Sequence, residues 1–220
     1  MGSVTVMPDT HADNREYLVV HQTLRFLLDR FVGASERLDP NALADVLPDR
    51  WAMFARGLHH HHETEDTKFF PVVVRERPDA KPLVDELERD HEHLVARLDA
   101  VDAAIAALTA TPTPESRARA HDAVAAVRDE LVPHLDREDT ELLPIAAASV
   151  DGREWKQLGD DALRSIPKQD LPIVAGALDE VVRTLPPEQR PPPPPLPVRL
   201  LLAVSWRRRY RTFIAPLGST

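Results

Sequence analysis

Two stretches of the sequence repeat one pattern, and this repeat limits the possible folds more than any other feature. Residues 61–71 and 134–144 both read His-x-x-x-Glu-Asp-Thr-x-apolar-apolar-Pro. Residues four positions apart lie above one another on one face of a helix, so the histidine and the glutamate of each copy form a chelating pair. Two such pairs predict a site for two metal ions. The pairs are His61 with Glu65 and His134 with Glu138.

Each pair interrupts an apolar seam that has helical spacing. The first seam consists of Trp51, Phe54, Leu58, Phe69 and Val72, and the second of Val124, Val127, Leu131, Leu142 and Ile145. Such a seam is the core-facing stripe of a helix, so both pairs should be buried. Burial of an unpaired carboxylate is costly, and a cation is therefore expected beside each glutamate. A single pair would more often be a core histidine beside a surface glutamate, but two copies in one register favour metal ligands.

The composition favours a helical protein and argues against several classes of function. Only 5% of the 220 residues are aromatic and only 7 are glycine, so we expect an all-α fold without a sheet. The formal net charge of -9 disfavours nucleic acid as a partner. Because the chain has no cysteine, nitrogen and oxygen atoms must hold any metal. The start does not resemble a signal peptide, and no apolar run could span a bilayer, so we expect a soluble, cytoplasmic protein.

Helical periodicity predicts four long helices joined by short turns. The first should cover about residues 13–38, and the second should begin at Asp39-Pro40 or restart at Pro48. A turn at residues 77–79 precedes the third helix, and Thr113-Pro114 opens the fourth. Helices joined in this way form an up-down-up-down four-helix bundle, which can bring six side chains to one level of its interior. These side chains are His21, His61, Glu65, His91, His134 and Glu138.

The other histidines near these positions are expected outside the centre. Residues 59–62 are all histidine, but only His61 lies on the mid-line of the apolar seam. The other three are therefore assigned to the surface or to supporting positions. On the third helix, His91 continues the apolar seam, whereas His93 points away from it and should be solvated.

The residues after position 150 lie outside the repeated pattern. We expect residues 11–150 to form the bundle that holds the two-metal site, and residues 151–220 to form a helical extension. Within the extension, residues 151–165 and 170–185 read as two shorter helices that cover one end or side of the bundle.

The last part of the chain leaves two questions open. The prolines at residues 191–195 must form an extended polyproline stretch, either as a rigid spacer or as a ligand for an SH3-like protein partner. Residues 196–213 are apolar at first and then rich in arginine. We expect the leucine and tryptophan residues of this segment to dock on the bundle, with its arginines facing the acidic body. Contact with an anionic membrane surface is the less favoured alternative.

The order of these residues resembles the hemerythrin-like family, also called the HHE cation-binding domain. Its pattern is a histidine on the first helix, H-x-x-x-E on the second, a histidine on the third and H-x-x-x-E on the fourth. The likeness covers about residues 11–150 and includes the apolar-proline ending of both motifs. The resemblance implies a four-helix bundle with a non-haem di-iron centre that is oxo- or hydroxo-bridged. It also implies that the irons are held by His21, His61, Glu65, His91, His134 and Glu138, with both glutamates bridging.

The residues alone do not determine which metal is bound. Imidazole and carboxylate ligands also suit zinc and manganese, and zinc binds such ligands more tightly than iron does. A carboxylate-bridged pair inside a helical bundle is typical of di-iron or di-manganese.

The third helix departs from the pattern of the oxygen-carrying members, which have a second histidine one turn after the first. Here Val95 follows His91 by four residues and Leu87 precedes it by four, so a fifth histidine ligand is not evident. His62 or His93 could supply one if a helix is locally overwound. Without it, each iron keeps an open position, which suits a reactive centre better than a simple reversible oxygen carrier.

Three functions are compatible with this sequence. The first is a non-haem di-iron protein that binds or senses oxygen, nitric oxide or a related small oxidant. The second is a di-iron oxidoreductase that acts on peroxide or nitric oxide, or a protein of iron-centre repair. For this alternative Tyr17, one turn before His21, is a candidate proton or electron donor. The third is an interaction protein whose metal is structural or absent.

Overall fold

The computed structural model describes residues 12–218, and these residues form helices and connecting turns without any strand. The start of the chain, where the lack of a signal peptide was judged, and the predicted domain start at residue 11 lie outside them. The bundle consists of α1 (Arg15–Arg37), α2 (Pro40–Thr64), η1 (Glu65–Phe69), α3 (Phe70–Glu76), η2 (Pro78–Ala80), α4 (Lys81–Ala110), α5 (Pro114–Arg137), η3 (Glu138–Leu142) and α6 (Leu143–Ser149). The extension consists of α7 (Gly152–Ser165), α8 (Leu171–Thr184), η4 (Pro187–Gln189), α9 (Leu196–Leu201), η5 (Leu202–Trp206), α10 (Arg207–Ile214) and η6 (Ala215–Leu217).

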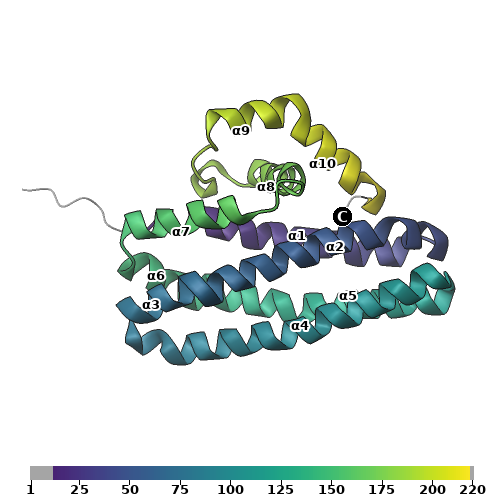
Figure 1. Cartoon of the computed structure of the whole chain (residues 1–220), viewed down its shortest axis with the longest axis horizontal. Helices are drawn as coiled ribbons and strands as arrows, with labels where there is room; N and C mark the ends of the chain where they lie inside the picture. The colour runs from purple at the N-terminus through teal and green to yellow at the C-terminus, as the bar shows by residue number, and fades with distance from the viewer. Residues whose placement is uncertain (1–11, 219–220) are drawn as a thin grey trace, which may run out of the picture.

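The four long helices run up-down-up-down, as predicted (Figure 1). Helix α1 packs beside α2 and α5, and α4 packs beside the same two helices. Their apolar stripes meet in one core away from the metal motifs, which includes Leu28, Phe31, Leu43, Leu47, Trp51, Phe54, Leu94, Val124 and Leu131. The sequence therefore predicted the fold class and the order of the helices correctly.

The ends of the helices follow the local capping signals. Asp39 caps α2 by accepting hydrogen bonds from the backbone N–H groups of Asn41 and Ala42, and Pro40 occupies the first helical position. Of the two predicted starts, the structure takes this one, and α2 continues through Pro48 without a restart. Thr113 caps α5 in a reciprocal capping box with Ser116.

Each repeated motif ends in one wide helical turn. The π-helical turns η1 and η3 begin at the motif glutamates, and the N–H groups of Phe70 and Leu143 donate to the carbonyl oxygens of Glu65 and Glu138. A proline follows immediately in the first turn of α3 and of α6. Because proline has no N–H to donate, it suits the start of a newly phased helix. The extra residue shifts the helical phase, so that Phe70 and Val73 are buried as well as the predicted Phe69 and Val72.

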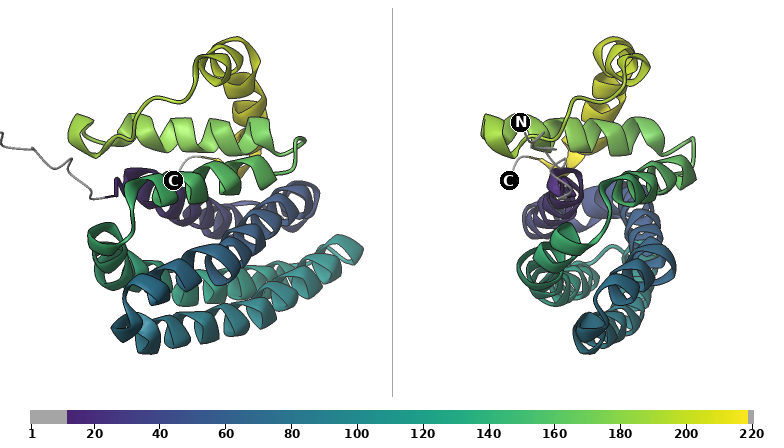
Figure 2. Two further views of the ribbon diagram at one scale, coloured as in Figure 1. Left: turned by 60° about the vertical axis from the view of Figure 1, so that its left-hand side comes forward. Right: turned by 90° about the vertical axis from the view of Figure 1, so that its left-hand side faces the viewer.

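The extension forms a layer across α1 and α2. Figures 1 and 2 show α8 lying over α1, with α9 and α10 arching above α8. The two predicted short helices are α7 and α8, and residues 190–195 contain no helix. The core of the bundle continues into this layer through Ile173, Ala177, Tyr210, Ile214 and Leu217.

The prediction that the leucine and tryptophan residues of the last segment dock on the bundle is wrong for most of them. Of these leucines Leu202 is buried, in η5, which packs on α8. Tyr210, Ile214 and Leu217 dock on the bundle, because α10 and η6 return to it and α9 does not. No residue of α9 is buried, and Trp206 is only half-buried. One arginine of the segment, Arg207, pairs with Asp179 of α8 through two contacts of 2.7 Å.

No helix among residues 12–218 is both long enough and apolar enough to cross a membrane.

The crossing of α8 and α10 generates a prediction. A Cβ atom added at Gly176 would overlap the Cβ of Tyr210, whereas one added at Gly57 would meet no atom within 4 Å. We expect Gly176→Ala to lower the free energy of unfolding by about 1–3 kcal/mol. The matched control Gly57→Ala, on an exposed helix face, should be neutral or stabilising by up to about 1 kcal/mol. Denaturant unfolding of both variants tests this, and equal stabilities would contradict the close crossing.

Candidate metal centre

All six predicted residues meet at one level of the bundle interior. His21 comes from α1, His91 from α4, and the two motif pairs from the junctions of α2 with η1 and of α5 with η3. Five of the six are buried, and the side chain of His61 keeps 12% of its surface exposed. A seventh residue, His62, joins them.

Three histidines from three different helices form one cluster, which we call the three-histidine group. It contains His62 of α2, His91 of α4 and His134 of α5, with one ring nitrogen of each within 4.8 Å of the others. The Nε2 atoms of His91 and His134 are 3.1 Å apart. The ring of His62 stacks on that of His91 with a centroid distance of 3.9 Å. Three imidazoles converging in this way match the donor set of a transition-metal site.

The remaining four residues form a second cluster, which we call the mixed group. It contains His21, His61, Glu65 and Glu138, and its ligand atoms also lie within 4.8 Å of one another. His61 Nε2 is 3.2 Å from Glu65 Oε1, as the spacing of four residues on one helix predicts. His21 Nε2 is 3.4 Å from Glu138 Oε2, a contact that only the packing of α1 against α5 creates.

Both glutamates of the mixed group also contact the three-histidine group. Glu65 turns Oε1 towards His61 and places Oε2 at 3.6 Å from His91 Nε2. Glu138 Oε2 lies 3.4 Å from His21 Nε2 and 3.6 Å from His134 Nε2. Each carboxylate therefore contacts one histidine of each group, which is the position that a bridging ligand requires.

The assignment of His62 to the surface is wrong, because the side chain is buried and its ring lies beside those of His91 and His134. Adjacent helical residues differ by about 100° in direction, so His61 and His62 face the two different groups from one turn of α2. Regular α-helix continues through Thr64, and the irregular turn that follows is wider than an α-turn, so no overwinding is involved. His93, the other candidate, is exposed on α4. The run of four histidines at residues 59–62 was the sequence signal for an additional buried histidine. Helical spacing alone does not say how many of the four reach the interior of the bundle.

Three aspartates outside the two groups hold the histidine rings in place. Asp66 Oδ1 lies 2.8 Å from His91 Nδ1, and Asp139 Oδ1 lies 2.7 Å from His21 Nδ1. The aspartate that follows the first motif glutamate thus orients His91 of α4, and the one that follows the second orients His21 of α1. This arrangement leaves each Nε2 free to face the centre.

The third of these aspartates binds more loosely. Asp90 Oδ2 lies 3.4 Å from His134 Nδ1. Arg25 contacts Asp139 at 2.8 Å, and Arg137 contacts Asp90 at 3.3 Å, so both carboxylates are also anchored on their outer sides. The repeated aspartate was present in the sequence motif, but its role was not inferred from it.

Tyr17 borders the mixed group. Its ring lies 4.6 Å from that of His21 and 5.9 Å from that of His61, measured between centroids. The hydroxyl group donates a hydrogen bond to Glu65 Oε1, rather than to solvent or backbone. Burial and the charges of Glu138 and Glu65 raise the Tyr17 pKa well above its ordinary value, so the hydroxyl keeps its proton.

Burial lowers the pKa of three histidines of the centre, whereas at His21 burial is outweighed by Asp139 and Glu65, which raise its pKa. Burial lowers the pKa of His61 from 6.5 to about 3 and that of His134 from 6.5 to about 4. Burial also lowers the pKa of His62 well below its ordinary value. These imidazoles are therefore neutral near pH 7, the form that coordinates a metal.

The two glutamates respond in opposite ways to the same surroundings. Burial and the neighbouring Glu65 charge raise the pKa of Glu138 well above its ordinary value. For Glu65 burial also favours the neutral form, but His61 and His21 outweigh it, and the pKa of Glu65 is lowered. Two carboxylates that share one buried space in this way repel each other unless a cation lies between them.

Several polar atoms at the centre lack a hydrogen-bond partner within residues 12–218. They are the Nε2 atoms of His21, His61 and His62, Oε2 of Glu65 and both carboxylate oxygens of Glu138. Buried polar atoms are otherwise almost always satisfied. Because these atoms face one another as lone-pair donors, metal cations fit between them.

Comparison with protein families agrees with this donor set. Residues 14–146 match the model of the hemerythrin HHE cation-binding domain. The chain belongs to the hemerythrin family of HHE cation-binding domains. A comparison with curated proteins found no significant match, and neither did one with solved structures. The matched range of this hemerythrin-family chain contains all seven residues of the two groups.

The neutral histidines predict how stability depends on pH in the metal-free protein. Their pKa values in the folded state, about 3 for His61 and about 4 for His134, lie below the ordinary 6.5, so the unfolded chain binds more protons below that pH. Their contribution to stability is complete above about pH 6.5 and is lost as the pH falls towards 4.

We expect the free energy of unfolding to fall by on the order of 1 kcal/mol per pH unit for each such histidine. Urea unfolding of the metal-free protein at several pH values measures the slope. His61→Leu should flatten it and the exposed His93→Gln should not. A slope unchanged by His61→Leu would contradict burial of a neutral His61.

The position of His62 gives a second prediction. Replacing His62 by Gln removes a nitrogen from the three-histidine group, and we expect metal affinity to fall by more than about tenfold. His93→Gln, on the exposed face of α4, is the matched control and should bind metal normally. Metal content after dialysis against a graded series of chelator concentrations distinguishes the two variants. Equal retention by both would show that His62 is not a ligand.

Proposed function

We propose that this hemerythrin-family protein holds two iron ions and uses them to bind oxygen, nitric oxide or a related small oxidant. The observation that carries the proposal is the pair of buried donor groups joined by Glu65 and Glu138, whose facing atoms lack partners among the described residues. Two carboxylates between two clusters of imidazoles inside a helical bundle are the typical setting of a di-iron or di-manganese centre. Binding of oxygen or nitric oxide requires a redox-active metal. Iron is redox-active and zinc is not.

The two metal positions are unequal in their protein donors. The three-histidine group offers three nitrogens besides the two glutamates, and the mixed group offers only two. With His62 included, a metal at the three-histidine group would have one more protein donor than the sequence predicted. A metal held by His21 and His61 would have fewer protein donors and would therefore keep room for a small ligand. His61 is also the most exposed of the predicted ligands, which supports entry of that ligand from its side.

The size of the site supports a small ligand. Two hollows among the described residues are lined by residues outside the two donor groups, one at the extension and one around Glu63 and Lys68. An organic substrate would need a cleft that leads to the reacting atoms. A diatomic molecule or peroxide needs only the space beside His61.

An oxidoreductase that acts on peroxide or nitric oxide is the second candidate function, and Tyr17 favours it. Tyr17 places a protonated hydroxyl on Glu65 beside the metal position that has fewer donors. A positioned donor of this kind can hold or deliver a proton to a small oxidant at that position.

Metal analysis with ligand binding tests the proposal. Protein produced in iron-supplemented medium should contain close to two irons per chain and should bind nitric oxide or oxygen with a change in its optical spectrum. Glu138→Ala should lose iron and thermal stability together, whereas Glu141→Ala, an exposed glutamate in the same turn, should lose neither. A single zinc, or no metal after anaerobic loading with iron, would overturn the di-iron assignment. Steady-state consumption of peroxide or nitric oxide would favour the enzyme over the binding protein.

Tyr17→Phe isolates the role of the hydroxyl group, because it keeps the ring and removes only the donor. We expect the iron content to stay unchanged, since Tyr17 is not a ligand. The rate of nitric oxide release, or of peroxide turnover, should change about tenfold, which corresponds to about 1.4 kcal/mol. Stopped-flow spectroscopy measures the release rate. Identical kinetics in the variant would reduce Tyr17 to a packing residue.

A further inference from the structure

The outer face of the last helical segment, residues 196–214, carries a cluster of exposed apolar side chains. Four of the six large hydrophobic residues that are exposed in the described chain lie there. They are Leu196 (62% exposed), Leu200 (56%), Leu201 (43%) and Val204 (81%). Three of them follow one another at spacings of four residues and therefore share one helical face. The other two exposed residues, Val95 and Leu163, stand on separate helices.

The charge of this segment is opposite to that of the rest of the chain. From residue 190 to the end the sequence contains six arginines and no acidic residue, although the whole chain carries a formal charge of -9. Arg208, Arg209 and Arg211 are exposed on α10, directly after the apolar face. Arg208 and Arg209 form no ion pair with any residue of the described chain, so their charge is available to an outside partner.

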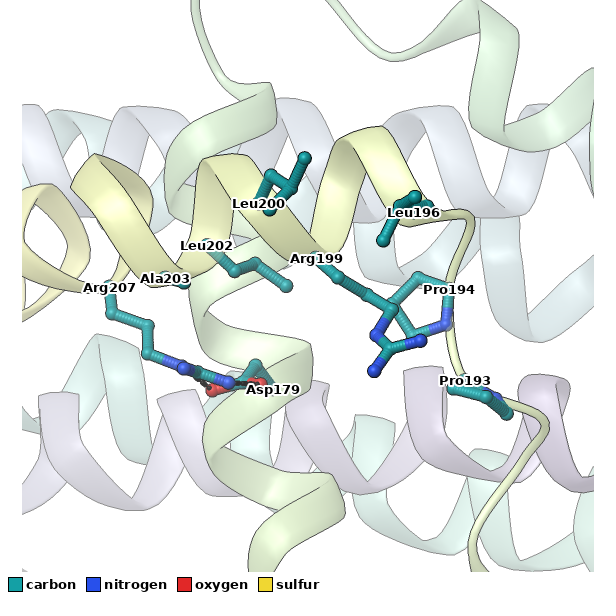
Figure 3. Close-up of a pocket in the computed structure, with 9 residues that line it drawn as sticks. All are labelled: Asp179, Pro193, Pro194, Leu196, Arg199, Leu200, Leu202, Ala203 and Arg207. Carbon is teal, nitrogen blue, oxygen red and sulfur yellow. Dashed lines mark hydrogen bonds and ion pairs between the residues drawn. The ribbon is translucent and has the colours of Figure 1, made fainter.

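A groove lies beside the apolar face. It has a volume of about 450 Å³ and runs between α9, α8 and the proline stretch. Figure 3 shows the guanidinium group of Arg199 reaching into it, flanked by Pro193 and Pro194. The pair Arg207–Asp179 closes the opposite wall, while Arg199 has no ionic partner within residues 12–218. A cation in a groove with apolar walls suits an anionic head group that is joined to apolar chains.

We propose that the segment from Leu196 to Ile214 binds the surface of an anionic lipid bilayer. The segment is the outermost part of the molecule and arches away from the bundle, so the layer can meet a flat surface along this edge (Figures 1 and 2). Leu196, Leu200 and Val204 enter the interface, and the arginines contact the anionic head groups. Half-buried Trp206 lies between the apolar and basic parts, where tryptophan commonly lies at a membrane interface.

This surface suits a bilayer better than a second copy of the chain. A stable contact between proteins buries about 800 Å² on each partner and needs complementary shapes. A narrow, convex helix edge offers little surface for a complementary protein interface. It can insert between lipid head groups, because these rearrange around it. The helix lies on the membrane in this proposal and does not span it, in agreement with the absence of a spanning helix in the described chain.

Vesicle co-sedimentation of the metal-loaded, full-length protein tests the proposal. The protein should bind vesicles of phosphatidylcholine mixed with phosphatidylglycerol and should not bind vesicles of phosphatidylcholine alone. Added salt should weaken binding, because it screens the arginines. Failure to bind the anionic vesicles, or equal binding to both kinds, would overturn the proposal.

Two pairs of variants separate the apolar and the ionic contributions. The double variant Leu200→Gln and Val204→Gln should weaken binding by about tenfold or more. Its control, Val95→Gln with Leu163→Gln, removes exposed apolar groups elsewhere and should have no effect. Arg208→Gln with Arg209→Gln should weaken binding by about fivefold for each arginine, whereas Arg119→Gln with Arg153→Gln, on exposed positions of the bundle and α7, should weaken it much less.

The alternative outcomes are distinct. Equal losses in the test and control variants would overturn the assignment of this surface. A dimer in analytical ultracentrifugation that dissociates in Leu200→Gln with Val204→Gln, without vesicle binding by the parent protein, would assign the surface to a second copy. Iron content and nitric oxide binding should be unchanged in all of these variants, so the result is independent of the proposed function.

Discussion

The burial of two carboxylates among five imidazoles is the constraint on which the rest of the structure depends. Seven groups that water would otherwise solvate are packed between four helices, and several of their atoms find no hydrogen-bond partner in the described chain. Such an interior is stable only with cations between the carboxylates, or with an altered protonation state that the opposite pKa shifts of Glu65 and Glu138 already indicate. The metal centre and the fold are therefore coupled, and loss of the metal should loosen the bundle around it.

The internal repeat explains how the chain holds this centre with few kinds of interaction. Each H-x-x-x-E-D motif supplies a histidine and a glutamate to the centre, and its aspartate orients a histidine outside both motifs, His91 for the first motif and His21 for the second. The wide turn that starts at each glutamate resets the helical phase before the proline. His62 breaks this symmetry, because Leu135 occupies the matching place in the second motif. The two donor groups become unequal for that reason, and the one with fewer histidines lies on the side of His61 and Tyr17.

The two faces of the C-terminal extension differ: one packs on the bundle and the other is exposed. Towards the bundle, Trp155 of α7 packs against Tyr17 and Phe69 and so covers the end of the metal centre, with ring centroids 6.4 Å and 5.5 Å away. Tyr210 and Ile214 join the core on α8. Away from the bundle, the same layer exposes leucines and arginines. An oxidant sensor or scavenger at a membrane surface would meet apolar gases where they are most concentrated, which links the two proposals without making either depend on the other.

The sequence by itself determined the helical fold, the order of the helices and the six residues that the structure brings together. These features are local or periodic: a chelating pair four residues apart, apolar stripes and caps such as Asp39 and Thr113 are fixed by helix geometry alone. Tertiary structure decided the rest. Only the packing of α2 against its neighbours brings His61 beside His21 and His62 beside His91 and His134. Only the crossing of α8 and α10 at Gly176 buries Tyr210, while α9 stays outside. Helical periodicity indicates which residues share a face. What that face contacts, whether another helix, a metal or solvent, depends on long-range packing, which a single segment does not encode.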